Sequence, residues 1–159
     1  MADLTSNCGG IISPNPFWLA SAPPANSGLQ VMRAFDAGWG GAVWKTLGQP
    51  IQNVSSRFGA TGYRGTAAIG FNNIELITDR SLDINFREIV EVKRRFPNHA
   101  VIVSLMVETK QEWQEIIKRS IDTGADGLEL NFGCPHGMCE RGMGSAVGQE
   151  PRVNAEITS

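Results

Sequence analysis

The chain has 159 residues, of which 42% are hydrophobic and 19% charged, and a formal net charge of -2. These values are ordinary for one globular domain with its own core, and the slight negative charge excludes the basic field that holds nucleic acid. No apolar run of about 18 residues and no signal peptide are present, so we expect no contact with a membrane. Three cysteines, an odd and sparse count, indicate a reducing cytoplasm.

The N-terminal segment is predicted to form short strands. Gly9-Gly10 has the character of a hairpin turn between Leu4–Cys8 and Ile11-Ile12. After Pro14 and Pro16, the run Phe17–Ala22 is predicted to be a buried strand.

Helices and strands then alternate along the chain. A helix is predicted from the caps Asn26 or Ser27 to Gly38, with residues 47–80 irregular apart from turns. The second helix is predicted to place Phe86, Ile89 and Val90 on one buried face. The third helix is predicted to begin with a capping box of Thr109 and Glu112. Its buried residues are predicted to be Trp113, Ile116, Ile117 and Ile121. The alternation predicts a parallel α/β fold, with these remaining elements: strand Gly41–Thr46, helix Asn85–Phe96, strand Ala100–Met106, a helix ending at Gly124, and strand Gly127–Asn131.

Two of the predicted strands end on a polar residue. Lys45 and Asn131 stand at the same place in two similar segments. In each segment a helix ends at a glycine, a strand follows, and the strand ends in the polar residue. The carboxyl ends of parallel strands form the rim that carries active sites, so both are candidate site residues. Alternatively, Lys45 extends out of the rim to solvent and Asn131 begins an Asx turn. Glu129, one layer deeper, is predicted to be a buried structural carboxylate.

A glycine-rich loop, 131–144, follows the last predicted strand. Cys134 within it could be an acid–base or nucleophilic thiol, could bind a metal with His136 and Cys139, or could simply pack. A structural zinc site needs four ligands, and only Cys8 and His99 remain to complete this set. We therefore predict no metal.

Several segments together resemble the dihydroorotate dehydrogenase-like family, specifically its dihydropyrimidine dehydrogenase branch. The resemblance runs from about Leu4 to Gln149, and the loop that begins Cys134-Pro135-His136-Gly137-Met138 is particular to that branch. It implies the N-terminal half of a TIM (β/α)8 barrel, with about four parallel strands, helices and a preceding β-hairpin. Residues 1–159 would be one partial domain, with a divergent tail at 150–159. The other segments that carry the resemblance are Pro14–Phe17, Leu19–Ala22, Ala37–Gly40, Lys45-Thr46 and Asn73–Leu76.

The resemblance also implies FMN at the carboxyl-end rim. Ala20, Ser21 and Ala22 would line the flavin, because small side chains let a flat ring approach the backbone. Lys45 and Thr46 would meet the isoalloxazine, where a cation stabilises the anionic reduced form.

The implied substrate is uracil or thymine, in pyrimidine catabolism. Asn73 and Asn131 would hydrogen-bond the pyrimidine edge, beside Phe132 and Gly133, because an amide offers both a donor and an acceptor. Hydride would pass from reduced FMN to C6, while Cys134 protonates C5 as the general acid. Gly133 departs from the serine that family members commonly have before this cysteine.

The resemblance further implies a larger assembly. The complete enzyme would carry iron–sulfur clusters, with FAD and NAD in a partner subunit, in a homo- or hetero-oligomer. Since the chain stops after four barrel strands, we expect it to be inactive by itself. Two alternatives stay open: a dihydroorotate dehydrogenase of pyrimidine biosynthesis, and a truncated, non-catalytic half-barrel.

Overall fold

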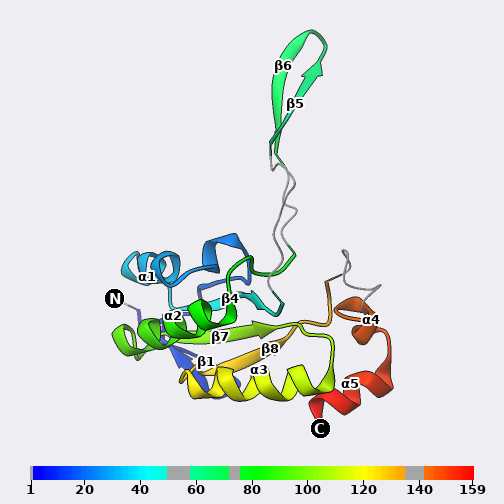
Figure 1. Cartoon of the computed structure of the whole chain (residues 1–159). Coiled ribbons are helices and arrows are strands. Elements are labelled where there is room, and N and C mark those ends of the chain that lie inside the picture. Colours follow the sequence, from blue (N-terminus) through cyan, green and yellow to red (C-terminus); the bar gives the residue numbers. More distant parts are fainter. Residues whose placement is uncertain (1, 50–57, 72–75, 135–141) are drawn as a thin grey trace.

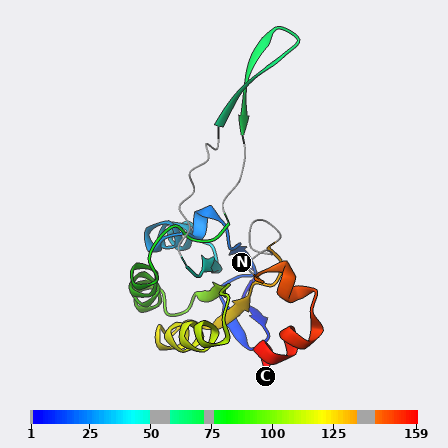
Figure 2. The same cartoon turned by 45° about the vertical axis from the view of Figure 1, so that its right-hand side comes forward.

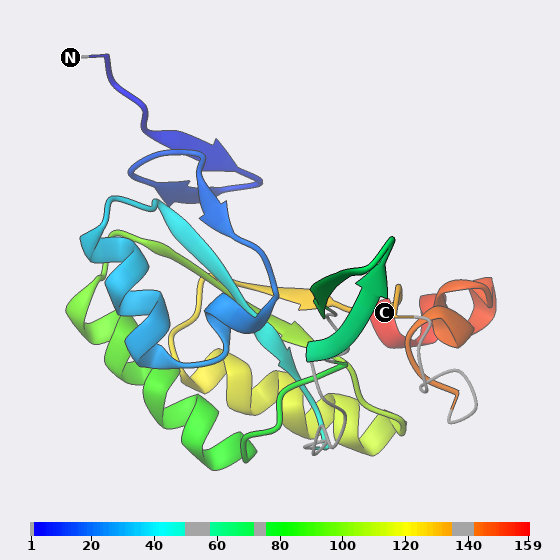
Figure 3. The ribbon, with the colours of Figure 1, turned by 90° about the horizontal axis from the view of Figure 1, so that it is seen from above.

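A four-stranded parallel sheet forms the centre of the computed structural model, which describes residues 2–49, 58–71, 76–134 and 142–159. The strand order is β3-β4-β7-β8, and each neighbouring pair is parallel. The helices α1, α2 and α3 cover one face of this sheet (Figures 1 and 3). The α/β fold is confirmed, and its arrangement is that of half a barrel. The bounds are β3 Trp18–Leu19, β4 Gly41–Leu47, β7 Ala100–Leu105, β8 Gly127–Leu130, α1 Gly28–Asp36, α2 Leu82–Arg95 and α3 Lys110–Asp122.

The predicted N-terminal hairpin is confirmed. β1 (Ser6–Cys8) pairs antiparallel with β2 (Ile11–Ser13). Gly9 and Gly10 connect them with φ of +61° and +98°, which side chains disfavour. The hairpin lies against the start of β8, since a Cβ built on Gly127 would stand 2.9 Å from Ile11 Cδ1.

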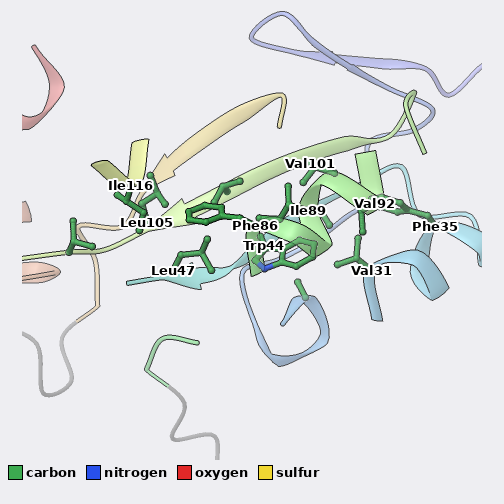
Figure 4. Packing of buried hydrophobic residues seen from close by; sticks show 14 of the residues in the cluster. Val31, Phe35, Trp44, Leu47, Phe86, Ile89, Val92, Val101, Leu105 and Ile116 are labelled. Atoms are coloured by element: carbon green, nitrogen blue, oxygen red, sulfur yellow. The ribbon is translucent and has the colours of Figure 1, made fainter. Parts of the chain in front are cut away.

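The hydrophobic core lies between the sheet and the three helices (Figure 4). β7 turns Val101, Val103 and Leu105 toward the helices, as the two-residue alternation of a strand requires. Trp44 is fully buried among them and donates its indole N–H to Asn85 Oδ1 at 2.9 Å. This bond satisfies a polar atom that would otherwise destabilise the core.

Serine and threonine caps begin the three helices, as predicted for α1 and α3. The cap Ser81 was not predicted, and α2 begins at Leu82 rather than at the predicted Asn85. Ser27, Ser81 and the Thr109–Glu112 capping box bond the first turns of α1, α2 and α3. Two predicted core positions are wrong: Val90 is 46% and Ile121 62% exposed. On each helix the buried stripe continues instead through the 3- and 4-residue spacings, to Val92 on α2 and to Ser120 on α3.

The stretch predicted to be irregular, 47–80, contains a second hairpin. β5 (Phe58–Tyr63) and β6 (Thr66–Phe71) pair antiparallel and extend away from the body (Figures 1 and 2). Arg64 and Gly65 form the turn, both with positive φ, which suits a two-residue hairpin loop. The many glycines and alanines in these strands weaken the sequence signal for strand.

Two further predictions near the sheet need correction. Glu129 is exposed rather than buried, because the parallel sheet of the described residues has four strands and does not close around this position. In the run 17–22 only Trp18 and Leu19 form a strand, and Phe17 is 62% exposed.

The remaining described elements are short, namely the turn of 3-10 helix η1 (Pro23–Ala25), α4 (Ser145–Gly148) and α5 (Pro151–Thr158). No helix in the described ranges combines the length and the apolar character needed to cross a membrane.

Candidate active site

A bulge near the end of β4 shapes the rim. Trp44 pairs with Val103 and Leu47 with Leu105, so Lys45 and Thr46 together stand opposite Ser104. In a regular strand, residues three apart point to opposite faces, yet the bulge lets Trp44 and Leu47 both be buried in the helix-side core. Lys45 and Thr46 therefore both project on the side of the sheet away from the helices.

Lys45 is a buried cation on this rim. The residue is 5% exposed, and its ammonium group donates to Leu76 O at 3.2 Å. Within the described ranges no carboxylate forms an ion pair with it. Burial lowers the pKa of Lys45, and the electrostatic interaction with the nearby Cys134 acts in the opposite direction. An ammonium group in this setting can donate to an electron-rich ligand.

Cys134 is half-buried beside the same rim. Its side chain packs against a small apolar cluster of Ile77, Met106 and Met143. Its carbonyl oxygen accepts a hydrogen bond from Ser145 N at 3.1 Å. A Cβ at Gly144 would lie 2.4 Å from that oxygen, so only glycine allows the chain to pass here. Gly144 and Ser145 therefore lie directly against the main chain of Cys134.

Four hydroxyl and amide groups form a chain across the sheet. Thr46 Oγ1 lies 3.2 Å from Ser21 Oγ and 2.9 Å from Ser104 Oγ. Asn131 Nδ2 donates to Thr46 Oγ1 at 3.1 Å. Each of the four parallel strands, or the residues that directly follow it, thus contributes one polar group.

Ser104 belongs to this row of hydrogen-bonded groups but was not predicted from the sequence. It is fully buried in the otherwise apolar strand β7, one residue from its carboxyl end. A lone serine in the predicted strand Ala100–Met106 was the available signal, because a buried hydroxyl requires a partner.

The other predicted site residues lie in different settings. Ala20 is exposed, while Ser21 and Ala22 are half-buried directly after β3. Phe132 turns its ring toward Trp113, with centroids 5.9 Å apart, and so packs on the helix side. Gly133 is exposed and donates its N–H to Asn131 Oδ1 at 3.2 Å. Asn73 lies outside the described residues.

The described ranges contain no group of three or more His, Cys, Asp and Glu side chains that could hold a metal ion. His136 and Cys139, which the metal hypothesis needs, lie outside those ranges.

The sequence profile of the dihydrouridine synthase (Dus) family matches residues 75–159, which is more than half of the chain. The chain belongs to this family, which implies a flavin cofactor.

Full-length relatives extend the similarity over nearly the whole chain. It is 43% identical to the chloroplastic dihydropyrimidine dehydrogenase (NADP(+)) of Arabidopsis thaliana, over 98% of this chain and 38% of that protein. It is 40% identical to the NAD-dependent dihydropyrimidine dehydrogenase subunit PreA of Escherichia coli K12, over 95% of this chain and 37% of the subunit. The chain is 26% identical to the catalytic subunit of dihydroorotate dehydrogenase B (NAD(+)) from Thermoplasma acidophilum, over the whole of this chain and 50% of that subunit. The chain therefore spans well under half of its two more similar relatives.

Proposed function

We propose that this chain is part of a flavin-dependent oxidoreductase that reduces the 5,6 double bond of uracil or thymine. The observation that carries the proposal is the arrangement of Lys45, Cys134 and Asn131 at one rim of the sheet. A cation, a thiol and an amide are the groups that flavin chemistry on a pyrimidine requires. The relatives from Arabidopsis thaliana and Escherichia coli K12, which are at least 40% identical to this chain, are both named dihydropyrimidine dehydrogenases.

FMN is the cofactor that these residues fit best. The ammonium group of Lys45 has three N–H donors, and one of them is bonded to the carbonyl oxygen of Leu76. The rest of the side chain is buried. Ala20, Ser21 and Ala22 follow β3 at the same edge and leave room beside the backbone, and Thr46 stands next to Lys45. When bound, FMN would supply hydride for C6 of the pyrimidine.

Cys134 then delivers the proton that C5 needs. A thiol group carries a proton that it can donate as a general acid. The hydrogen bond from Ser145 N to its carbonyl oxygen holds Cys134 at the rim, close to Lys45. Asn131, with Phe132, Gly133 and Asn73, would bind the pyrimidine edge through amide and main-chain groups.

The proposed enzyme draws its electrons from a partner. The Escherichia coli relative is named a subunit of an NAD-dependent enzyme. By analogy we propose iron–sulfur clusters in the complete protein, an NAD- and FAD-binding partner subunit and an oligomeric, cytoplasmic assembly.

Flavin absorbance of the complete protein that contains this chain, followed by anaerobic reaction of the reduced flavin with uracil, tests the proposal. We expect bound FMN to be released by denaturation and uracil to reoxidise the reduced flavin, whereas the 159-residue chain by itself should not reduce uracil. Oxidation of dihydroorotate, with no reaction with uracil, would favour the dihydroorotate dehydrogenase alternative. Absence of flavin even after incubation with excess FMN would favour the non-catalytic half-barrel, which the partial coverage of the relatives also suggests.

A further inference from the structure

We infer that Thr46 is a positioning residue whose hydroxyl group fixes the amide of Asn131 for the substrate and is not available to the cofactor. The inference rests on the proposed function for the identity of the substrate. The hydrogen-bond chain itself is independent of that function.

The direction of each bond in the chain follows from counting protons. Ser21 Oγ donates to the carbonyl oxygen of Trp44 at 3.0 Å, and a hydroxyl group has only one proton. In its contact with Thr46, Ser21 is therefore the acceptor and Thr46 the donor.

The same count fixes the other two bonds of Thr46. Its single proton is directed to Ser21, so the hydroxyl of Ser104 must donate to Thr46 Oγ1. Asn131 Nδ2 donates to the same oxygen. Thr46 Oγ1 thus gives one hydrogen bond and receives two, which is the full capacity of a hydroxyl group.

Asn131 is held in one orientation by its two neighbours. The main-chain N–H of Gly133 can only donate, so the atom facing it must be Oδ1. The amide nitrogen consequently faces Thr46. Among the described residues, each end of the amide keeps one position without a partner, a second N–H proton and a second oxygen lone pair.

This orientation suits a pyrimidine edge with adjacent C=O and N–H groups. Flipping the amide would exchange its donor and acceptor and would oppose N–H to N–H at Gly133. Thr46, supported by Ser21 and Ser104, therefore determines which end of the amide faces which group of the substrate. Any contact of Thr46 with flavin would use its main chain or methyl group.

A double-mutant cycle without flavin tests the hydrogen-bond chain. We compare the unfolding equilibrium constants of Thr46→Val, Asn131→Ala and the double variant, since valine keeps the shape of threonine without its hydroxyl. We expect a coupling of about threefold or more between the two sites, in line with neighbouring residues in one network. Thr46→Ser, which keeps the hydroxyl, should restore the coupling, and strictly additive effects would overturn the inference.

A second measurement separates positioning from cofactor binding. In the FMN-loaded chain, Thr46→Val should weaken uracil binding, followed by the flavin spectrum, by about tenfold, or 1.4 kcal/mol. FMN affinity should stay within about threefold of wild type, and Thr46→Ser should bind both as wild type does. An equal loss of FMN and uracil affinity would instead make Thr46 a cofactor ligand. If the wild-type chain binds neither FMN nor uracil, the proposed function fails, whereas the cycle still decides the role of Thr46 toward Asn131.

Discussion

Gly144 is the residue on which the placement of Cys134 depends most directly. Its φ of +57° and ψ of -122° disfavour any side chain, and an added Cβ would meet Cys134 O at 2.4 Å and Met106 Sδ at 3.2 Å. Gly144→Ala should therefore destabilise the chain by about 1–3 kcal/mol, the range for a residue forced into a disfavoured backbone region. It should also raise the alkylation rate of Cys134, because the close approach of Gly144 to Cys134 O is lost.

Chemical denaturation and iodoacetamide labelling with mass spectrometry would measure both effects. Gly62→Ala is the matched control, since its Cβ would meet only Thr66 O, at an ordinary 3.9 Å. Unchanged labelling of Cys134 in Gly144→Ala would show that the thiol does not depend on this close approach.

The proposed acid role of Cys134 makes a kinetic prediction. Serine is a far weaker acid than cysteine, and general acid catalysis contributes roughly 10²–10⁴ in rate. In an FMN-loaded enzyme, Cys134→Ser should lose about that factor in uracil reduction and keep its flavin spectrum. Cys8→Ser is the control, because Cys8 is exposed on the N-terminal hairpin. Wild-type activity in Cys134→Ser would contradict the acid role. Release of bound metal by both Cys134→Ser and Cys139→Ser would support a metal site instead.

At the scale of elements, a charged clamp joins α1, α2 and the loops before them. Glu88 on α2 accepts hydrogen bonds from Gly28 N at 2.7 Å and Arg80 Nη1 at 2.6 Å. Arg80 Nη1 also donates to Asn26 O at 2.9 Å. The guanidinium of Arg80 lowers the pKa of Glu88, and the N–H of Gly28 adds to this effect. The segments after β3 and before α2 are thereby tied together beside the rim.

This clamp predicts a specific loss of stability in acid. The folded-state pKa of Glu88 lies below that of the unfolded chain, about 4.3. Its ion pair therefore stabilises the fold above that value, and the contribution disappears as the pH falls through the lower folded-state pKa. Glu88→Gln should cost about 1–2 kcal/mol at neutral pH, as expected for a charged hydrogen bond that is partly exposed.

Denaturant unfolding at several pH values checks the clamp prediction. The difference between wild type and Glu88→Gln should shrink steadily below about pH 4. Glu91→Gln, which removes the partner of the exposed Arg94 on the same helix, should have a much smaller effect at every pH. A constant difference between wild type and Glu88→Gln across the acid range would exclude an ionic contribution.

Local signals in the sequence predicted most of these elements. The cap Ser27 and the capping box at Thr109 act within one turn of helix, so the sequence alone reveals them. The apolar run of β7 similarly predicts a strand with helices packed against it. The rim positions of Lys45 and Asn131 follow from the same strand boundaries.

Features that depend on distant partners were not predictable in this way. The bulge at Lys45 and Thr46 exists because Trp44 and Leu47 must both reach the helix-side core, and simple alternation places Thr46 on the wrong face. Ser104 acquires its role only when Thr46, 58 residues earlier in the chain, lies beside it. The dipeptide Arg64-Gly65 is only a weak signal for a hairpin. The strands on either side, β5 and β6, lack bulky residues at most positions, so the sequence does not mark them as strands.

At the scale of the whole molecule, the described sheet has two open edges and one open face. β3 and β8 are the outer strands, and Glu129 is exposed on β8. The hairpin β5–β6 adds two further strand edges, and its strands carry no charged residue. Phe58, Tyr63 and Ile69 on it are 63%, 69% and 79% exposed. Uncharged strand edges pair readily with other chains, because nothing repels a second edge.

We therefore predict that the 159-residue polypeptide self-associates at micromolar concentration. Sedimentation velocity across a dilution series should show mass increasing with concentration, and thermal unfolding should end in aggregation. Replacing residues 58–71 with a short glycine–serine linker shows whether self-association comes from the hairpin or from the open edges of the sheet. A free two-stranded hairpin contributes little stability, so the unfolding midpoint should stay near that of the intact chain. If association weakens strongly in this variant, the hairpin is the main contact; if it persists, the open edges at β3 and β8 are responsible. A monomer that melts cooperatively at all concentrations would contradict the prediction and would mean that the half-barrel protects its own edges.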